Sequence, residues 1–245
     1  MIGGNKASSN FTIRFHFERT GRLRFTSHLD MLRTFQRAFL RAKTPIAYSQ
    51  GFNPHPEFVI GMPLGVGTTS EAEYADLGMD TKIPISDFIC ALNTKLPDGL
   101  RIIAAEYKNN KENIMGNINE LRCVIKFEEQ VDKQKLSDAL NLMLGRDEIL
   151  IEKSSKKGTK VVEIRSKIRD AQVSEEGEIL LRCDAGSHSN LSPELFVEAL
   201  KKEMSQMSGA EASANSNTYV TVHRTGILVE KDGKVLNPMD PEAMN

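Results

Sequence analysis

Residues 11–43 read FTIRFHFERTGRLRFTSHLDMLRTFQRAFLRAK, and this stretch decides the fold class. At its start every second side chain is apolar, namely Phe11, Ile13, Phe15 and Phe17. This period of two predicts a half-buried strand over residues 11–17, followed by a turn at Thr20-Gly21. From Ser27 the period becomes that of a helix, which Pro45 must stop. A strand followed by an amphipathic helix predicts a layered unit that contains both kinds of element.

The predicted helix over residues 27–43 has a capped start and a basic face. Ser27 and Asp30 stand three positions apart, which is a capping-box variant with Asp at its third position. Arg33, Arg37 and Arg41 follow at intervals of four residues and form a stripe opposite the apolar face. Such a stripe is either an ordinary solvated helix face or a surface for an anion.

The order of predicted elements is strand, helix, two strands, helix, strand, and it recurs after a polar segment. We therefore predict an α+β protein made of tandem ferredoxin-like (βαββαβ) units, with antiparallel sheets and helices on one face. The expected parts are a disordered leader at 1–10, an N-terminal unit at 11–108, a linker at 109–119, a C-terminal unit with an extra hairpin at 120–230 and a tail at 231–245.

The composition is that of a globular protein, with 40% hydrophobic and 27% charged residues. No stretch reaches the roughly 20 apolar residues of a membrane helix, and the N-terminus lacks the apolar core of a signal peptide, so we expect a cytoplasmic protein without membrane contact. Cys90, Cys123 and Cys183 are far apart and form no C-x-x-C pair. We interpret each cysteine as a small buried hydrophobic residue, and we expect neither a metal site nor an iron–sulfur cluster.

Charge is distributed unevenly along the chain. Residues 1–60 contain nine Lys and Arg against three acids, a net of +6, whereas the whole chain carries −1. The asymmetry indicates that the N-terminal part faces something anionic.

Residues 51–56 form an unusual loop, Gly-Phe-Asn-Pro-His-Pro. Prolines on both sides of His55 restrict the backbone, and a rigid loop of this kind either closes one end of the sheet or positions side chains for a ligand. Gly65 and Gly67 lie in a second loop, which lacks the lysine pattern of a nucleotide-binding P-loop. We expect His55 and Asn53 to meet His28 at the helix start and form a small anion-binding pocket.

Residues 22–74 resemble the radical-SAM-associated family of unknown function. The resemblance rests on S-H-L-D, on Y-S-x-G-F-N-P-H-P, on P-L-x-V-G and on S-x-x-E-Y, which are carried here by Ser27–Asp30, Tyr48–Pro56, Pro63–Gly67 and Ser70–Tyr74. Glu57 and Phe58 depart from the pattern, where Lys and a small residue are expected. The resemblance implies a partner, a cobalamin-type radical SAM protein encoded nearby, and no cofactor in this chain itself.

The residues that we predict to bind a ligand or partner come from these motifs and from the helix. They are Ser27, His28, Asp30, Arg33, Arg37, Arg41, Tyr48, Ser49, Gly51, Phe52, Asn53, His55, Gly65 and Gly67.

Three hypotheses of function follow. The first is a non-catalytic accessory protein of a radical SAM enzyme that binds RNA or presents the substrate. The second is a protein–protein adaptor without a nucleic-acid role. The third is a metal-independent endoribonuclease of tandem ferredoxin-like type, with His28 as its one candidate catalytic group, and it rests on fold analogy alone.

Overall fold

The computed structural model describes the whole chain except residues 1–8, 10, 111, 129–130, 156–157 and 208–218. The predicted leader at residues 1–10 therefore lies outside the described residues, apart from Ser9. The chain divides into two compact units, with Met1–Ile118 and Gly226–Asn245 in unit 1 and Asn119–Thr225 in unit 2. Both units contain helices and antiparallel strands, so the prediction of a mixed α+β protein is confirmed.

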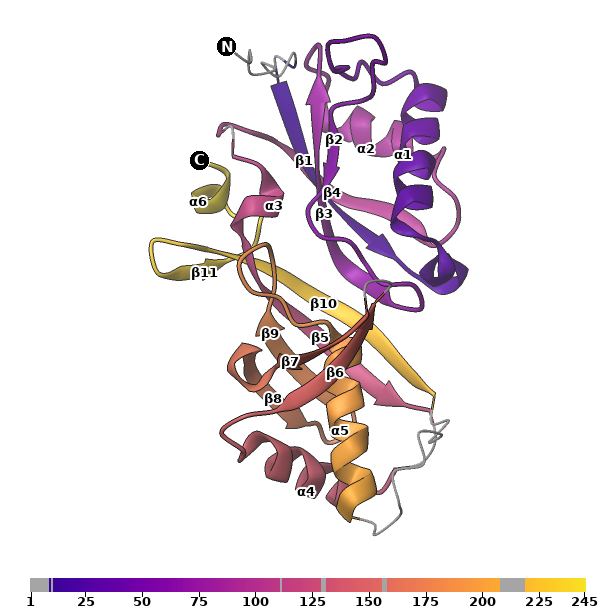
Figure 1. Ribbon diagram of the computed structural model, residues 1–245. Helices are drawn as coiled ribbons and strands as arrows, with labels where there is room; N and C mark the ends of the chain where they lie inside the picture. The colour runs from indigo at the N-terminus through magenta and orange to yellow at the C-terminus, as the bar shows by residue number, and fades with distance from the viewer. Residues whose placement is uncertain (1–8, 10, 111, 129–130, 156–157, 208–218) are drawn as a thin grey trace. The chain divides into compact units, whose positions relative to one another are not determined.

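Unit 1 contains, in chain order, β1 (Phe11–Arg19), a 3-10 helix (Gly21–Phe25), α1 (His28–Ala42), β2 (Phe58–Ile60), β3 (Thr69–Met79), α2 (Ile85–Asn93), β4 (Leu100–Lys108), α3 (Ile114–Asn117), β11 (Lys234–Leu236) and α6 (Pro241–Met244). Strand β1 lies between β4 and β3, and β2 pairs with β3, all antiparallel. Helices α1 and α2 cover one face of this sheet, and the segment that ends in α6 lies on the other (Figure 1).

The alternation in β1 builds the core of unit 1. Phe15 and Phe17 point toward the helices, where both rings contact Phe35 of α1, at centroid distances of 5.6 and 5.0 Å. Phe58 of β2 stacks on Phe15 at 6.1 Å and meets Phe39 edge-on at 5.2 Å. Each buried phenylalanine contributes about 1.5–3 kcal/mol by leaving water. This aromatic cluster fixes α1 against the sheet and so determines which side of the helix remains exposed.

Several local expectations for unit 1 need correction. The turn expected at Thr20-Gly21 continues as a 3-10 helix that contains Leu23 and Phe25. The polar segment 109–119 contains α3, whose Ile114 is fully buried. A methyl group on Gly61 would lie 3.0 Å from the Ile114 side chain, so a larger residue there would force Ile114 to shift. Elements β11 and α6 form within residues 231–245, where no pattern was recognised.

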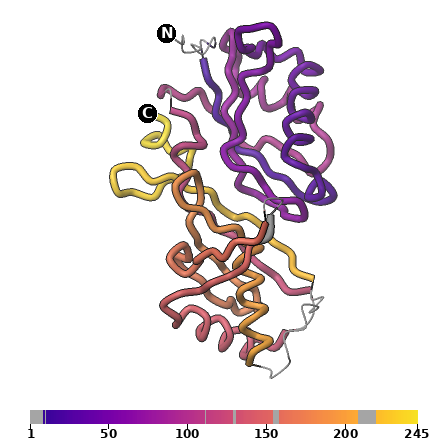
Figure 2. Tube along the Cα trace, in the orientation of Figure 1, coloured from indigo at the N-terminus to yellow at the C-terminus, as the bar shows by residue number. Residues whose placement is uncertain are grey.

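Unit 2 contains β5 (Ile118–Phe127), α4 (Lys133–Leu144), β6 (Leu150–Ser155), β7 (Gly158–Glu163), a 3-10 helix (Arg165–Lys167), β8 (Ile168–Val173), β9 (Ile179–Asp184), α5 (Pro193–Met207) and the first part of β10 (Val220–Lys231). Strand β5 lies between β10 and β9, and β8 pairs with β9. Strands β6 and β7 form a separate antiparallel hairpin. Helices α4 and α5 lie side by side, and the Cα trace shows the same arrangement (Figure 2). The extra hairpin expected in this region is present.

The interpretation of the cysteines is right for two and wrong for one. Cys123 and Cys183 are buried, but Cys90 lies on the exposed side of α2. Burial raises the pKa of the Cys123 thiol well above its usual value and that of Cys183 to about 12. These two thiols therefore carry almost no thiolate near neutral pH, and thiolate is the reactive form.

Alkylation should consequently distinguish the three thiols. At a pH near 8.5, about the ordinary pKa of a thiol, we expect iodoacetamide to modify only Cys90 in the native protein. After unfolding it should modify all three cysteines. Peptide mass mapping would locate the label. Rapid labelling of Cys183 in the native state would contradict its buried position.

Candidate functional site

The start of α1 is capped as the sequence predicts. Ser27 Oγ accepts a hydrogen bond from the backbone N–H of Asp30 at 3.2 Å, and the Ser27 hydroxyl donates to Asp30 Oδ2 at 2.7 Å. Asp30 also accepts a hydrogen bond from Arg33 Nη1 at 3.1 Å. The hydrogen bonds from Ser27 and Arg33 hold the pKa of Asp30 below its ordinary value. The carboxylate is thus ionised and engaged in local contacts.

A buried arginine joins the helix start to the second glycine-containing loop. Arg19 is 2% exposed and donates hydrogen bonds to the carbonyls of Thr26 at 3.1 Å, Gly65 at 2.6 Å and Thr68 at 2.8 Å. The amide of Gly67 also donates to the Arg24 carbonyl at 2.6 Å. The structure therefore brings the S-H-L-D and P-L-x-V-G motifs together. The sequence analysis did not identify Arg19, which ends the predicted strand.

Exposed apolar side chains surround this junction. Phe25, Leu29 and Val66 are 59%, 63% and 63% exposed. His28 is half-buried and lines a cavity of only 10 Å³, which is about the smallest space that holds a single water. The helix start is accordingly a protruding surface rather than a pocket for a small substrate.

The three arginines of α1 project from its exposed side. Arg33, Arg37 and Arg41 are all exposed, and the helix carries a single acid, Asp30. Arg41 Nη2 donates to the Lys95 carbonyl at 2.7 Å, which holds its guanidinium beside the end of α2. At a rise of 1.5 Å per residue the arginine positions succeed one another every 6 Å or so along the helix. We call Arg33, Arg37 and Arg41 the arginine stripe.

The Gly51–Pro56 loop is held by its own hydrogen bonds. Tyr48 and Pro56 form an antiparallel bridge, and the Ser49 amide donates to the His55 carbonyl at 2.9 Å. Ser49 Oγ lies 2.9 Å from His55 Nδ1 and accepts from the His55 amide at 3.1 Å. Phe52, at the tip, is fully exposed. The loop presents an aromatic ring to solvent on a preorganised backbone.

The expected meeting of His28 and His55 is wrong. Arg19, which precedes the helix start, pairs with Ser70 at the first end of β3, whereas Ile46, which precedes the loop, pairs with Met79 at the last end. These two ends are about 30 Å apart at 3.4 Å per residue. Residues 46 and 48 form only isolated bridges, and the chain runs back along β3 only after the loop, in β2, so the loop stays at the end of the sheet where α1 finishes.

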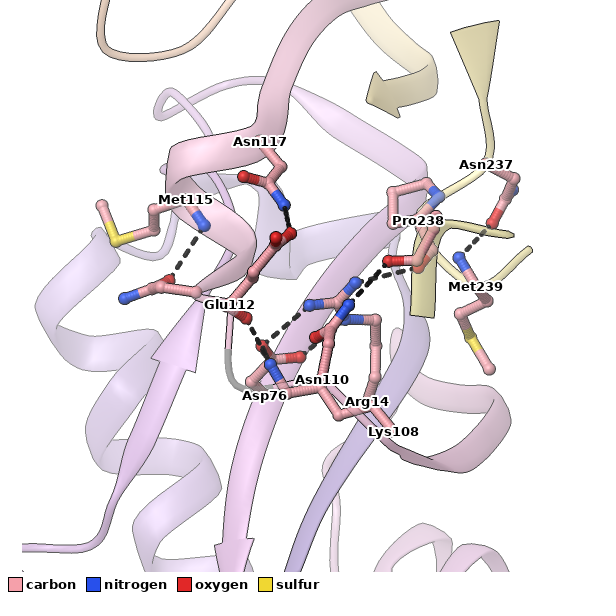
Figure 3. Close-up of polar contacts among 12 residues, drawn as sticks. Arg14, Asp76, Lys108, Asn110, Glu112, Met115, Asn117, Asn237, Pro238 and Met239 are labelled. Atoms are coloured by element: carbon pink, nitrogen blue, oxygen red, sulfur yellow. Dashed lines mark hydrogen bonds and ion pairs between the residues drawn. The ribbon is translucent and has the colours of Figure 1, made fainter. Parts of the chain in front are cut away.

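A buried polar network lies on the face of the unit 1 sheet that is opposite α1 and α2 (Figure 3). In each unit we call the sheet face opposite the helices the outer face. Arg14 of β1 forms a bidentate ion pair with Asp76 of β3. Nε donates to Oδ1 at 2.7 Å and Nη2 donates to Oδ2 at 2.9 Å. Lys108 Nζ of β4 donates to Asp76 Oδ2 at 3.0 Å and to the Glu112 carbonyl. Arg14 Nη1 donates to the Pro238 carbonyl at 3.0 Å, which ties the C-terminal segment to the sheet.

A cavity of 350 Å³ lies beside this network and the rigid loop. Its walls include Thr12, His55, Glu57, Asp76 and Lys108. The size lies within the range of ordinary ligand pockets. Asp76 and Lys108 satisfy each other there, the Glu57 carboxylate accepts from the Ser9 amide at 3.2 Å, and His55 Nδ1 lies 2.9 Å from Ser49 Oγ.

No group of three or more histidine, cysteine, aspartate or glutamate side chains in the described residues could hold a metal ion. Within the same part of the chain, no helix is long and apolar enough to cross a membrane.

The Arg14–Asp76–Lys108 network should be a large contributor to stability. We expect Asp76→Asn to lower the free energy of unfolding by about 3–5 kcal/mol, because two buried cations would lose their counter-charge. Asp30→Asn removes an exposed carboxylate that also pairs with an arginine, and it should change stability little. Urea denaturation measures both, and equal effects would contradict the assignment.

Comparison with known proteins places the chain in a family. No curated protein matches the sequence. Among solved structures, a Cbf5-Nop10-Gar1 complex matches with a TM-score of 0.42 and 8% identity over 92% of this chain and 55% of the other. An archaeal box H/ACA sRNP Nop10-Cbf5 complex matches with a TM-score of 0.36 and 8% identity over 88% of this chain and 47% of the other. This chain thus spans about half the length of the solved chains that it matches.

The family match is with the sequence itself. Residues 12–193 match the family described as "Uncharacterized protein conserved in bacteria (DUF2344)", which is well over half of the chain. These residues include the capped helix, the arginine stripe, the rigid loop and most of unit 2. The chain belongs to this family.

Proposed function

We propose that this protein is a non-catalytic, cytoplasmic accessory protein of a cobalamin-type radical SAM enzyme, and that it binds RNA in order to present it to that enzyme. The observation that carries the proposal is the arginine stripe on the exposed side of α1. The radical SAM partner is inferred from the resemblance of residues 22–74 to the radical-SAM-associated family.

The fold that we propose for both units is ferredoxin-like, which makes the protein a tandem of two such domains. In unit 1 the strands that precede and follow α1 and α2 lie in the order β4, β1, β3, β2. In unit 2 the corresponding order is β10, β5, β9, β8, with the β6–β7 hairpin inserted after the first helix. The same element sequence and the same spatial order in both units support a common βαββαβ plan.

The stripe suits a polyanion because its charge is exposed and only partly neutralised. Asp30 pairs with Arg33, so α1 keeps a surplus of two positive charges from Arg37 and Arg41. Lys95 adds a further exposed cation beside Arg41. Arginine and lysine in a row along an exposed helix are the electrostatic footprint of nucleic-acid backbone binding.

The outer face of the unit 1 sheet is less suited to this role. The C-terminal segment covers part of it, through Pro238 on Arg14 and through the Asn237 amide, which donates to the Tyr74 hydroxyl at 2.7 Å. Asn110 also reaches this segment, from Nδ2 to the Ala243 carbonyl at 3.1 Å. In unit 1 the helix side is therefore the surface that RNA would contact.

The rigid loop suits the partner protein. Phe52 is a fully exposed aromatic residue on a loop fixed by Ser49, His55 and two prolines. A preorganised aromatic side chain loses little conformational freedom on binding, and such residues dominate many protein–protein interfaces. The loop and the stripe would then serve separate partners.

Salt-dependent binding of single-stranded RNA tests the role of the stripe. We expect Arg33→Gln, Arg37→Gln and Arg41→Gln together to weaken binding and to reduce the slope of log K against log salt by about 2, since each phosphate contact on a single strand contributes about 0.7. Fluorescence anisotropy over a salt series measures both quantities.

The matched control removes three exposed helix lysines from unit 2, Lys133, Lys135 and Lys202, each changed to Gln. This variant should keep the wild-type slope. Equal losses in both variants would indicate non-specific attraction. A wild-type protein that binds only its partner protein would favour the adaptor hypothesis, and RNA cleavage without metal would favour the endoribonuclease hypothesis.

Co-purification tests the role of the loop. We expect Phe52→Ser to leave the unfolding midpoint unchanged, because the ring packs against nothing, and to reduce recovery of the radical SAM protein co-expressed with this chain. Val66→Ser, which removes another exposed apolar group at the other end of unit 1, is the control. Full recovery with Phe52→Ser would exclude the loop as the docking element.

A further inference from the structure

Unit 2 holds three arginines around one carboxylate. Glu120 of β5 has no exposed surface. Its Oε1 accepts from Arg122 Nε at 2.8 Å and from Arg182 Nε at 3.0 Å, and its Oε2 accepts from Arg169 Nη1 at 3.1 Å and Arg182 Nη2 at 3.2 Å. Burial raises the pKa of Glu120, but hydrogen bonds from Arg182 and Arg122 outweigh it and leave the pKa below its ordinary value.

Charge compensation alone does not require this arrangement. Arg182 by itself engages both oxygens of Glu120. Arg122 and Arg182 are direct partners across the β5–β9 ladder, and like charges placed opposite each other destabilise a sheet. Arg169 reaches the carboxylate because the β8–β9 register shifts between Ile168 and Asp170. Such irregularities redirect a side chain and are frequent beside functional sites.

The cluster retains open donors. Arg169 also pairs with Asp184 at 2.8 Å, and Asp170 lies opposite Arg182 in the β8–β9 ladder, so three arginines face three carboxylates. In the described part of the chain Arg122 uses only its Nε and Arg182 uses Nε and Nη2. Both side chains are 44% exposed. Two guanidinium groups with free Nη donors therefore lie together, oriented by Glu120.

An apolar pair follows the arginine pair along the same strands. Val124 and Leu180 are direct partners in the ladder, two residues from Arg122 and Arg182, and Leu180 is 36% exposed. Residues two apart in a strand point to the same face and lie about 7 Å from each other. The outer face of the unit 2 sheet thus offers an anion site and, two residues further along the strands, a partly exposed apolar pair.

We propose that this outer face of the unit 2 sheet binds a nucleotide of a single-stranded RNA, with a phosphate held by Arg122 and Arg182 and a base resting on Val124 and Leu180. The inference deepens the proposed function and rests on it, since it assigns a second RNA-binding surface. Two parallel N–H groups of a guanidinium can donate to two oxygens of one phosphate. Single-stranded RNA combines a charged backbone with flat apolar bases, and four-stranded sheets of this kind bind it in that way.

An acidic peptide fits the same surface less well. It would satisfy the two guanidinium groups, but a chain of carboxylates leaves the apolar side chains of Val124 and Leu180 uncovered. RNA places an uncharged base there instead.

The experiment uses the full chain and an oligouridine of about ten nucleotides. We expect Arg122→Gln with Arg182→Gln to weaken binding about tenfold, because charge-assisted hydrogen bonds to one phosphate are lost. Arg169 still compensates Glu120 in this variant, and its unfolding midpoint serves as a check of the fold. Lys133→Gln with Lys135→Gln, on the helix side of unit 2, is the charge-matched control and should bind like the wild type.

A second measurement does not depend on any variant. The methyl NMR signals of Val124 and Leu180 in the wild-type protein should shift as oligouridine is added, whereas those of the buried Leu121 and Leu181 should not. Unmoved Val124 and Leu180 signals at saturating RNA would overturn the inference.

The outcomes separate the two proposals. Loss of binding in the arginine-stripe variant, with wild-type binding in Arg122→Gln/Arg182→Gln, overturns the inference and supports the proposed function. The reverse pattern supports the inference and overturns the role of the stripe. Binding of polyglutamate in preference to RNA overturns both.

Discussion

The bidentate ion pair between Arg14 and Asp76 determines which face of the unit 1 sheet is open to a partner. It joins neighbouring strands at the centre of the sheet, and its remaining donor, Arg14 Nη1, holds the Pro238 carbonyl 224 residues away in sequence. Lys108 adds a second cation from the third strand. A buried carboxylate with two cations is stable only when all three groups stay in place. The C-terminal segment is consequently part of the folded unit, and it covers part of a sheet face that would otherwise be open.

The outer faces of the two sheets differ because their charges are arranged differently. In unit 1 the acid, Asp76, sits between two nearly buried cations, and protein atoms use the donors. In unit 2 the acid, Glu120, is buried beneath three arginines, two of which are 44% exposed. An acid with basic partners therefore closes the outer face of the unit 1 sheet, whereas it leaves cationic donors exposed on the outer face of the unit 2 sheet. Which face of a sheet can bind a ligand depends on this balance more than on the topology.

Periodicity and turn chemistry revealed the local structure before the fold was known. The alternation of Phe15 and Phe17, the cap at Ser27 and the stop before Pro45 are each determined by neighbours within a few residues. The exposed arginine stripe follows from the same helical period. The order of elements in unit 2, including the extra hairpin, was also predictable from alternating segments separated by turns.

The parts that the sequence did not reveal depend on contacts between distant residues. Asp76 pairs with Arg14 at a separation of 62 residues, and no local pattern links them. Residues 237–244 have no period of their own and are ordered by the sheet that they cover. The position of Arg169 depends on a register shift, which a period of two cannot indicate. The charges of Arg14 and Glu120 gave no warning, because each falls at a polar position of an alternating strand, where a charged residue is ordinary.

The separation of the two family motifs changes what each of them can mean. A single pocket would require Ser27–Asp30 and Gly51–Pro56 to meet, and β3 holds them at opposite ends. The first motif is instead completed by Gly65–Thr68, through the buried guanidinium of Arg19. The second is completed within itself, by Ser49 and His55. Each motif is a rigid segment with an exposed side chain. The first motif exposes Leu29 beside the arginine stripe, and the second exposes Phe52. Two separate surfaces on one small unit agree with the proposal that the protein holds two partners at once.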